Sequence, residues 1–188
     1  MKKQLSKLAQ TTQKFLTTWG AAEAELFILS RQIQHQNNVW DRRNWTGHLS
    51  ASALLLDRTR TYCYFVKHKV MKVWLAPGGH CEPFELPWEG AARELKEETS
   101  IADAILHPWH IKNEYCPVDI NTHKIPARKE RGEEEHMHHD FQYVFLSPTV
   151  GVHRQGRGED GSMGRMRSIE RLKEKYAPAL QRIKAMEG

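Results

Sequence analysis

The chain has 188 residues, of which 39% are hydrophobic and 27% are charged, and its formal net charge is +5 with histidine neutral. This balance excludes an intrinsically disordered protein, and the length suits one compact domain with a sizeable core rather than two catalytic domains. No apolar run approaches the length that a bilayer crossing needs, and the start Met1-Lys-Lys-Gln-Leu-Ser-Lys7 lacks the apolar centre of a signal peptide. We therefore expect a cytoplasmic protein with no membrane partner.

Cysteine usage and charge limit the chemistry further. The three cysteines, Cys63, Cys81 and Cys116, are odd in number and have no C-x-x-C spacing, so they indicate neither a disulfide framework nor a zinc knuckle. We expect ordinary thiols. The positive net charge attracts anions such as nucleotides, phosphosugars or RNA, although a solvated basic surface without a ligand explains the charge equally well.

The first third of the chain is expected to contain helices and then strands. Residues 3–36 space their leucines and phenylalanines as amphipathic helices do, with a break at Gly20. We assign residues 1–40 to an N-terminal helical extension, which either builds a homodimer interface or covers one face of the sheet, and residues 41–188 to the main domain. Residues 48–56 and 62–66 are expected to be strands that pair as a hairpin.

A short strand at residues 73–75 is expected to stop at Pro77, which lacks an amide donor, and Gly78 and Gly79 allow a sharp turn there. Residues 87–99 are helical in composition. Trp88, Ala92 and Leu95 would form the apolar stripe of that helix.

The last part of the chain is expected to return to strands and to end in a helix. Residues 103–117 and 136–147 have the composition of strands, joined by a mixed-charge loop around residues 124–135. A glycine-rich segment at residues 156–161 precedes a final helix from about Ser168 to Met186.

Three glutamates of the predicted helix, Glu94, Glu97 and Glu98, lie three or four residues apart and so share a face. Carboxylates this close repel one another unless a cation lies between them, and such oxygen-rich clusters suit Mg²⁺ or Mn²⁺. Arg93 precedes Glu97 by four residues and can reach Glu85 in the loop, so it would orient carboxylates. The fitting chemistry is attack of water on phosphorus. A solvated helix with i,i+4 salt bridges is the alternative, but it does not account for the nearby Pro-Gly-Gly segment.

The segment from Gly79 to Ile101 follows G-x5-E-x7-R-E-U-x-E-E-x-G-U, where U is bulky and apolar, and so resembles the Nudix box. Eight of the nine defined positions match, and Ser100 stands where the pattern has glycine. The resemblance implies an α/β fold, an α/β/α sandwich with a mixed sheet. It also implies metal-dependent cleavage of the diphosphate linkage of a nucleoside diphosphate linked to another moiety. Looser similarity to a bacterial Nudix group extends over residues 47–172.

The resemblance also implies roles for the box residues. Glu97 and Glu98 correspond to the main metal ligands, Gly78 to a carbonyl ligand, Glu94 to a further ligand or the general base, and Arg93 and Glu85 to the orienting pair. The glycine of the box normally ends the helix in a left-handed conformation, which costs a non-glycine residue about 1 kcal/mol. With Ser100 at this position we expect a slightly altered helix end and a retained site. Asp160 or Glu159 is similar to an extra acidic ligand or base of mutator-type Nudix enzymes, and a plain turn role is the alternative.

Gly79, whose bare backbone can come close to the ligand, is a candidate substrate-binding residue. Histidines and one aspartate supply the others. His136, His138 and Asp140 alternate on one face of a predicted strand. Such a row lines a polar substrate cleft, is simply exposed, or ligates a transition metal as a triad, and similar His-rich segments in the same Nudix group favour substrate contacts. His80, directly after Gly79, is expected to face the phosphates or to cap the loop, with a structural role as the alternative.

The substrate itself stays open among nucleoside triphosphates, ADP-ribose-like compounds and dinucleoside polyphosphates. Trp40, Trp45, Trp74 and Trp109 are expected to be mostly core residues, so none is assigned to base stacking. A second interpretation is an RNA 5′-end pyrophosphohydrolase, motivated by the positive charge. A third is a non-catalytic, ligand-sensing Nudix domain, which the retained box glutamates disfavour.

Overall fold

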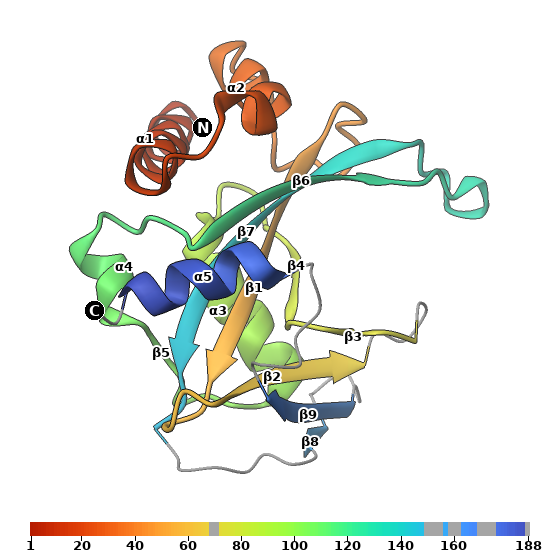
Figure 1. Ribbon diagram of the computed structural model, residues 1–188. Helices are drawn as coiled ribbons and strands as arrows, with labels where there is room; N and C mark the ends of the chain where they lie inside the picture. Colours follow the sequence, from red (N-terminus) through yellow and green to blue (C-terminus); the bar gives the residue numbers. More distant parts are fainter. Residues whose placement is uncertain (68–71, 149–155, 158–162, 169–175, 187–188) are drawn as a thin grey trace.

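The computed structural model describes residues 1–67, 72–148, 156–157, 163–168 and 176–186 (Figure 1). Its helices are α1 (Lys2–Trp19), the 3₁₀ turn η1 (Glu23–Leu26), α2 (Phe27–Gln34), α3 (Pro87–Thr99), α4 (Pro108–Lys112), the 3₁₀ turn η2 (Lys129–Arg131) and α5 (Ala177–Met186). Its strands are β1 (His48–Leu56), β2 (Tyr62–Lys67), β3 (Trp74–Leu75), β4 (Gly78–His80), β5 (Ile105–Leu106), β6 (Asp119–Ile125), β7 (His136–Leu146), β8 (Gly156–Arg157) and β9 (Met163–Ser168). In this part of the chain, no helix combines the length and apolar character that a membrane crossing requires.

The strands form one mixed sheet with β1 near its centre. The order is β5-β7-β1-β2-β9-β8, with β3 on β2, β4 on β1 and β6 on β7. Only β1 and β7 pair in parallel among the described strands, and they do so along their length, from His48 beside His138 to Leu56 beside Leu146. The other pairs are antiparallel. The predicted β1–β2 hairpin is confirmed.

Alternate side chains of β1 serve two separate cores, because successive strand residues point to opposite faces. Leu49, Ala51, Ala53 and Leu55 share one buried cluster with the α3 residues Ala91 and Leu95 and with the N-terminal helices. Leu54 and Leu56 belong to a second cluster with Tyr176, Ala179 and Ile183 of the C-terminal segment. Helix α3 therefore covers one face of the sheet and α5 the other (Figure 1), so the expected α/β/α sandwich with a mixed sheet is confirmed.

The N-terminal helices pack onto the same core as α3. Leu5, Leu8 and Phe15 of α1 are buried in that cluster, and the ring of Trp19 stacks on Trp109 of α4 with centroids 5.0 Å apart. Of the two uses that the sequence left open for this extension, these contacts support cover for the sheet.

Several expected boundaries are wrong. Residues 103–117 do not form one strand: only β5 is extended, and α4 follows directly after it. The strand that precedes β7 in the chain and pairs with it along most of its length is β6, which runs to Ile125. Pro108 begins α4, a position where its missing amide costs nothing. At the C-terminus, Ser168 ends β9 instead of opening a helix. Ala92, expected on the apolar stripe of α3, is exposed, and Ala91 takes the buried place.

The Pro-Gly-Gly segment is also not a sharp turn. Gly78 and Gly79 continue as strand β4, paired with Ser52 and Ala51 of β1, and neither has a positive φ. The two glycines serve a different purpose, which is close packing against β1 and α3.

Candidate active site

The acidic helix α3 is held at both ends by local hydrogen bonds. At its start, the backbone N–H of Leu86 donates to the Glu89 carboxylate at 2.9 Å, and an acidic side chain there also favours the positive end of the helix dipole. At its end, Ser100 adopts φ 58° and ψ 16°, and its N–H donates to the Lys96 carbonyl. The slightly altered helix end that we expected at Ser100 is not seen, because the serine itself adopts the left-handed conformation. The helix is continuous through Glu94, Glu97 and Glu98.

Arg93 binds three carboxylates and one carbonyl. Two of its guanidinium nitrogens donate to the two oxygens of Glu85, both at 3.0 Å, and this paired geometry fixes the plane of the carboxylate. Arg93 also donates to Glu94 at 2.8 Å and to Glu97 at 3.2 Å, and to the His80 carbonyl at 2.9 Å. The hydrogen bonds to Glu85 are the largest cause that raises the pKa of Arg93. One permanent cation thus ties the loop carboxylate to the helix and to β4.

The outer edge of β4 faces the carboxylates of α3. The inner edge of β4 and its flanking residues faces β1. There the Ala53 N–H donates to the Pro77 carbonyl at 2.8 Å, and the Cys81 N–H donates to the Leu49 carbonyl at 3.1 Å. The N–H of Gly78 points the other way and donates to Glu98 at 2.9 Å. Because the N–H and C=O of one strand residue project to the same edge, the Gly78 carbonyl also faces α3.

Both glycines of β4 lie too close to neighbouring atoms for a side chain. A methyl group on Gly78 would lie 2.6 Å from the Ala51 carbonyl oxygen and 2.7 Å from Ser52 Cβ, and one on Gly79 would overlap the Glu94 carboxylate. Glycine is therefore needed here so that β4 can pack between β1 and α3.

Glu94 is more enclosed than Glu97. Its side chain is 13% exposed, whereas that of Glu97 is 50% exposed. Burial raises the pKa of Glu94, and the hydrogen bond and charge of Arg93 act in the opposite direction. A raised pKa makes this carboxylate a better proton acceptor than an ordinary surface glutamate.

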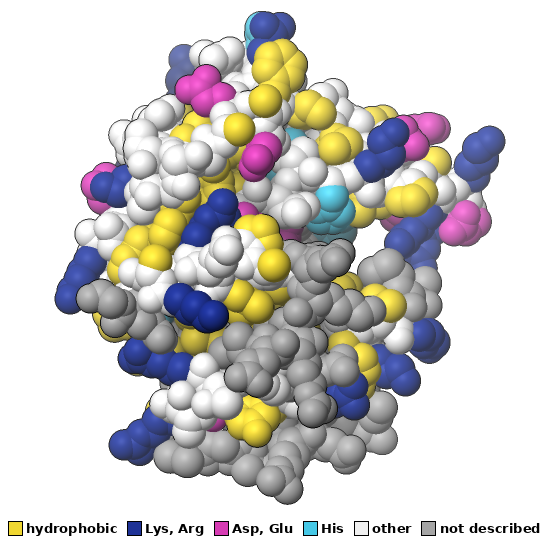
Figure 2. Space-filling model, in the orientation of Figure 1, with side chains coloured by type: hydrophobic (Ala, Val, Ile, Leu, Met, Phe, Trp, Pro, Cys, Tyr) yellow, Lys and Arg dark blue, Asp and Glu magenta, His cyan; other side chains and the backbone are white. Residues whose placement is uncertain are grey.

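A cavity of about 870 Å³ lies beside β4 on the face of the sheet that α5 covers. Gly78, Gly79 and His80 of β4 line it, together with Ser50 and Ser52 of β1 and Asp140 of β7. Five basic residues also line it: Arg42, Arg43, Lys124, Arg128 and Arg131. Figure 2 shows Lys and Arg side chains along the projecting arm formed by β6, β7 and their connecting loop, with histidine at its base. The cavity is therefore suited to an anionic ligand.

Asp140 lies in the cavity but is already well bound. The hydroxyls of Ser52 and Ser50 donate to its two oxygens at 2.8 Å and 3.3 Å, and Gln142 donates at 3.3 Å. It is thus a fixed acceptor on the cavity wall.

Four histidines in and behind the cavity, of which His48 and His139 are buried and His80 and His138 half-buried, are neutral at physiological pH. Burial lowers the pKa of His48, His80 and His139 to about 4 and that of His138 to about 2, in each case as the largest cause. His139 points to the opposite face, where Gln32 of α2 contacts it at 2.8 Å.

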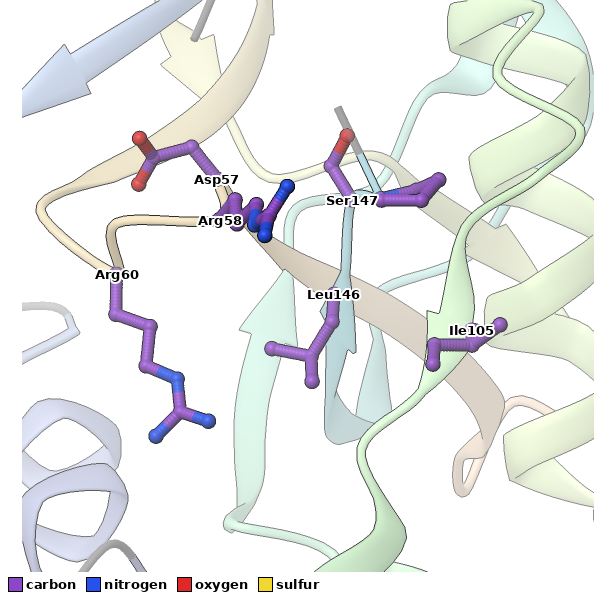
Figure 3. A pocket seen from close by; sticks show the side chains of 7 residues that line it. Asp57, Arg58, Arg60, Ile105, Leu146 and Ser147 are labelled. Atoms are coloured by element: carbon purple, nitrogen blue, oxygen red, sulfur yellow. The ribbon is translucent and has the colours of Figure 1, made fainter. Parts of the chain in front are cut away.

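A second, smaller pocket of about 230 Å³ lies at the opposite end of β1 and β7 (Figure 3). Its carboxylate, Asp57, accepts hydrogen bonds from Thr59, Thr61 and Tyr62, and so closes the turn between β1 and β2. Leu146 and Ile105, which are cross-strand partners, form its apolar side. A carboxylate engaged in this way has a structural role.

A family model described as "NUDIX domain" matches residues 46–185, which include α3, β4 and most of the residues that line the cavity. The chain belongs to the NUDIX family. A curated relative, "Probable DHNTP pyrophosphohydrolase" of Lactococcus lactis subsp. cremoris (strain MG1363), is 35% identical over 97 residues. These residues are 52% of each chain, so the chain matches about half the length of this relative.

Solved structures are similar to this NUDIX chain only loosely. A C. elegans Ap4A hydrolase binary complex has a TM-score of 0.47 at 15% identity, covering 74% of this chain and 96% of that one. A NUDIX family hydrolase from Clostridium perfringens has a TM-score of 0.46 at 18% identity, covering 78% of this chain and 97% of that one. Membership of the family therefore depends on the family model.

The predicted site residues fall into two groups on either side of β4. Glu85, Arg93, Glu94, Glu97 and Glu98 meet Gly78 and Gly79 at the outer edge of β4. His80, His136, His138 and Asp140 line the cavity. Asp160 and Glu159 lie outside the described residues.

Other cavity residues were not predicted. His48 and His123 line it together with Trp45, which contacts His136 with ring centroids 5.5 Å apart. A signal for the cavity face of β1 is present in the sequence, since His48, Ser50 and Ser52 are polar at alternate positions of an otherwise apolar strand.

Proposed function

We propose that the chain is a metal-dependent pyrophosphohydrolase that cleaves the diphosphate linkage of a nucleoside diphosphate joined to another moiety. The observation that carries this proposal is the outer edge of β4, where Gly78 and Arg93 hold the box carboxylates beside a cavity bordered by basic residues. The carboxylates would repel an anionic substrate in the neighbouring cavity unless cations lie between them. Metal-dependent hydrolysis of phosphoanhydrides uses this combination of carboxylates, cations and an anionic substrate.

The donors at this edge fit a hard divalent cation such as Mg²⁺ or Mn²⁺. They are oxygens without exception: the carboxylates of Glu94, Glu97 and Glu98 and the Gly78 carbonyl. A single guanidinium contacts three of the nearby carboxylates, so negative charge is left for a cation to balance. When bound, the cation neutralises charge that develops on the diphosphate and activates the attacking water.

The protein's own residues would divide the remaining work. Arg93 and Glu85 keep the helix aligned with β4, and Glu97 and Glu98 present oxygens at the same edge. Glu94, whose pKa burial raises, accepts a proton from water. We place the diphosphate over β4 and the rest of the substrate in the cavity, where His80, His136, His138 and Asp140 contact it.

The test is release of phosphate or pyrophosphate in Mg²⁺ or Mn²⁺ from a panel of nucleotides, nucleotide sugars and dinucleoside polyphosphates. DHNTP is included in the panel because it appears in the name of the curated relative, about half of whose length the chain matches. The comparison variant is the double substitution Glu97→Gln and Glu98→Gln. Glu23→Gln with Glu25→Gln is the matched control, because it makes the same charge change at two exposed glutamates of η1.

Turnover in the parent and in the control that disappears in the box variant supports the proposal and identifies the substrate. No turnover of any compound contradicts it and favours the non-catalytic, ligand-sensing domain.

A second candidate is hydrolysis at RNA 5′ ends, which the five basic cavity residues favour. Phosphate contacts by such residues make RNA binding steeply salt-dependent. Binding of a 5′-triphosphate RNA that does not weaken as salt is raised would exclude this candidate.

A further inference from the structure

Five histidines from four strands gather at one end of the cavity. His48 begins β1, and the parallel register places it directly beside His138 of β7. On the other side of β7, His123 of β6 is the cross-strand partner of His138, and His80 of β4 pairs with Ser50 of β1. His136 lies two residues before His138, on the same face of β7. The cluster is thus a product of the sheet register and does not depend on the box helix.

Ring nitrogens converge on His138. Its Nε2 lies 3.2 Å from Nε2 of His136 and 3.3 Å from Nε2 of His80. The ring of His48 contacts those of both β7 histidines, with each pair of centroids 4.7 Å apart. In the described part of the chain, His48, His136 and His138 form the one group of potential metal ligands whose donor atoms all lie within 4.8 Å of one another.

The hydrogen bond on the far side of His136 orients this ring for coordination. Its Nδ1 lies 2.6 Å from the backbone carbonyl of Glu134, and a carbonyl oxygen only accepts hydrogen bonds. Nδ1 therefore carries the proton, and in the neutral ring Nε2 presents its lone pair toward His138. Metal-bound histidines commonly show this arrangement, in which the ring nitrogen that does not bind the metal donates its N–H to a carbonyl.

His48 is the least satisfied member of the cluster. It is 2% exposed, and among the described residues neither of its ring nitrogens has a hydrogen bond of normal geometry; the backbone of Asn44 is the polar group next to the ring. A buried polar group without a partner destabilises the folded state. Water reaching the cavity or a bound ion would supply the missing partner, and the neighbouring lone pair of His136 favours the ion.

We propose that His48, His136 and His138 bind a divalent transition-metal ion, in the first place Zn²⁺, at a site separate from the box carboxylates. Imidazole nitrogen suits Zn²⁺, whereas Mg²⁺ and Mn²⁺ prefer oxygen. Two nitrogens that bind one Zn²⁺ at about 2.0–2.1 Å in a tetrahedral arrangement lie about 3.3 Å apart, which agrees with the 3.2 Å between His136 and His138. His80, whose Nε2 lies 3.3 Å from that of His138, and the cavity lie beside these three residues, so an anionic ligand from the cavity would complete the coordination of the ion.

The first experiment measures metal retention without turnover. The protein is stripped with a chelator, incubated with ZnCl₂, freed of unbound ion by gel filtration, and analysed for zinc by mass spectrometry. We expect about one Zn²⁺ per chain. His48→Asn, His136→Gln and His138→Gln should each weaken Zn²⁺ binding by more than about tenfold. His35→Gln, a substitution at an exposed histidine after α2, should retain the ion.

A second variant separates this site from the acidic edge. The double substitution Glu97→Gln and Glu98→Gln should retain Zn²⁺, because those residues are not ligands of this site. Loss of zinc from that variant would place the ion on α3 and overturn the proposal. So would a parent that retains no zinc, or histidine variants that retain as much as the parent.

A spectroscopic measurement on the parent does not depend on how the variants fold. Co²⁺ in place of Zn²⁺ should give the intense visible absorption of a four-coordinate, nitrogen-ligated ion, and only the weak absorption of an octahedral ion would contradict the proposal. Because neither measurement involves a substrate, failure of this site and failure of the hydrolase proposal are distinguishable.

Discussion

The two neighbouring glycines of β4 should respond differently to the same substitution. A methyl group on Gly78 meets atoms that are fixed by the sheet, namely the Ala51 carbonyl oxygen at 2.6 Å and Ser52 Cβ at 2.7 Å. On Gly79 the methyl group meets the carboxylate of Glu94, which is the end of a side chain and can rotate away. We expect Gly78→Ala to damage the fold and Gly79→Ala to damage the site.

The expected magnitudes follow from these contacts. Relief of the overlap at Gly78 requires β4 to separate from β1, and overpacking of this kind costs about 1–3 kcal/mol. Relief at Gly79 requires the Glu94 carboxylate to move by about 1 Å, a displacement that lowers the rate of a positioned reaction by about 100-fold. Its cost in the free energy of unfolding should stay within about 1 kcal/mol, since alanine also reduces the entropy of the unfolded chain.

Urea unfolding in metal-free buffer and turnover with Mg²⁺ measure the two effects separately. Addition of Glu94→Ala to Gly79→Ala supplies an internal control. With the carboxylate removed, the alanine should no longer destabilise the protein, so the double variant should be more stable than the sum of the single effects.

Equal loss of stability in the two glycine variants would show that the backbone contact at Gly78 is not the constraint we infer. Full activity of Gly79→Ala would show that the position of Glu94 does not matter for turnover.

Three further predictions concern the same helix. Arg93→Lys should lower the free energy of unfolding by about 2–3 kcal/mol in urea titrations, because lysine cannot reproduce the paired bonds to Glu85; an unchanged midpoint would contradict this role. Ser100→Gly should raise the melting temperature, with a gain of about 1 kcal/mol, because φ at this position is 58°, and no gain would mean that the serine is unstrained. Burial raises the pKa of Glu94 in the folded protein above 4.5, so the folded state binds more protons and loses stability as pH rises through that range. In metal-free urea titrations Glu94→Gln should lack this loss, and parallel pH profiles of parent and variant would refute it.

The helix and its chemistry were predictable because their signals are local. The spacing of Glu94, Glu97 and Glu98 is meaningful on any helix, and Arg93 lies one turn from Glu97, so its contacts follow from the same geometry. The left-handed end at Ser100 was not predicted, because serine in place of glycine led us to expect an altered helix end. The hydrogen bonds that place α3 against β4 depend on where β4 lies, which local spacing does not specify.

The error at Pro-Gly-Gly has a physical reason. Glycine pairs are typical of sharp turns because they tolerate positive φ, but they are equally needed where two backbones approach closely. Only the positions of Ala51 and Glu94 decide between these uses. The strand expected at residues 103–117 was wrong for a different reason. Helix α4, which lies in this range, is too short for its periodicity to be recognised.

The histidine cluster illustrates the limit most clearly. A metal triad of His136, His138 and Asp140 would require its first and last members to lie four residues apart on one strand, which is about 13 Å and too far for direct ligands of one ion. A cross-strand neighbour lies only about 4.8 Å away, so the third member of any such site comes from an adjacent strand. His48 takes that place because β1 and β7 pair in parallel. A parallel pair has no short turn that sets its register. His48 and His136 are 88 residues apart in the sequence, and so His48 can be identified as a ligand only when the sheet is known.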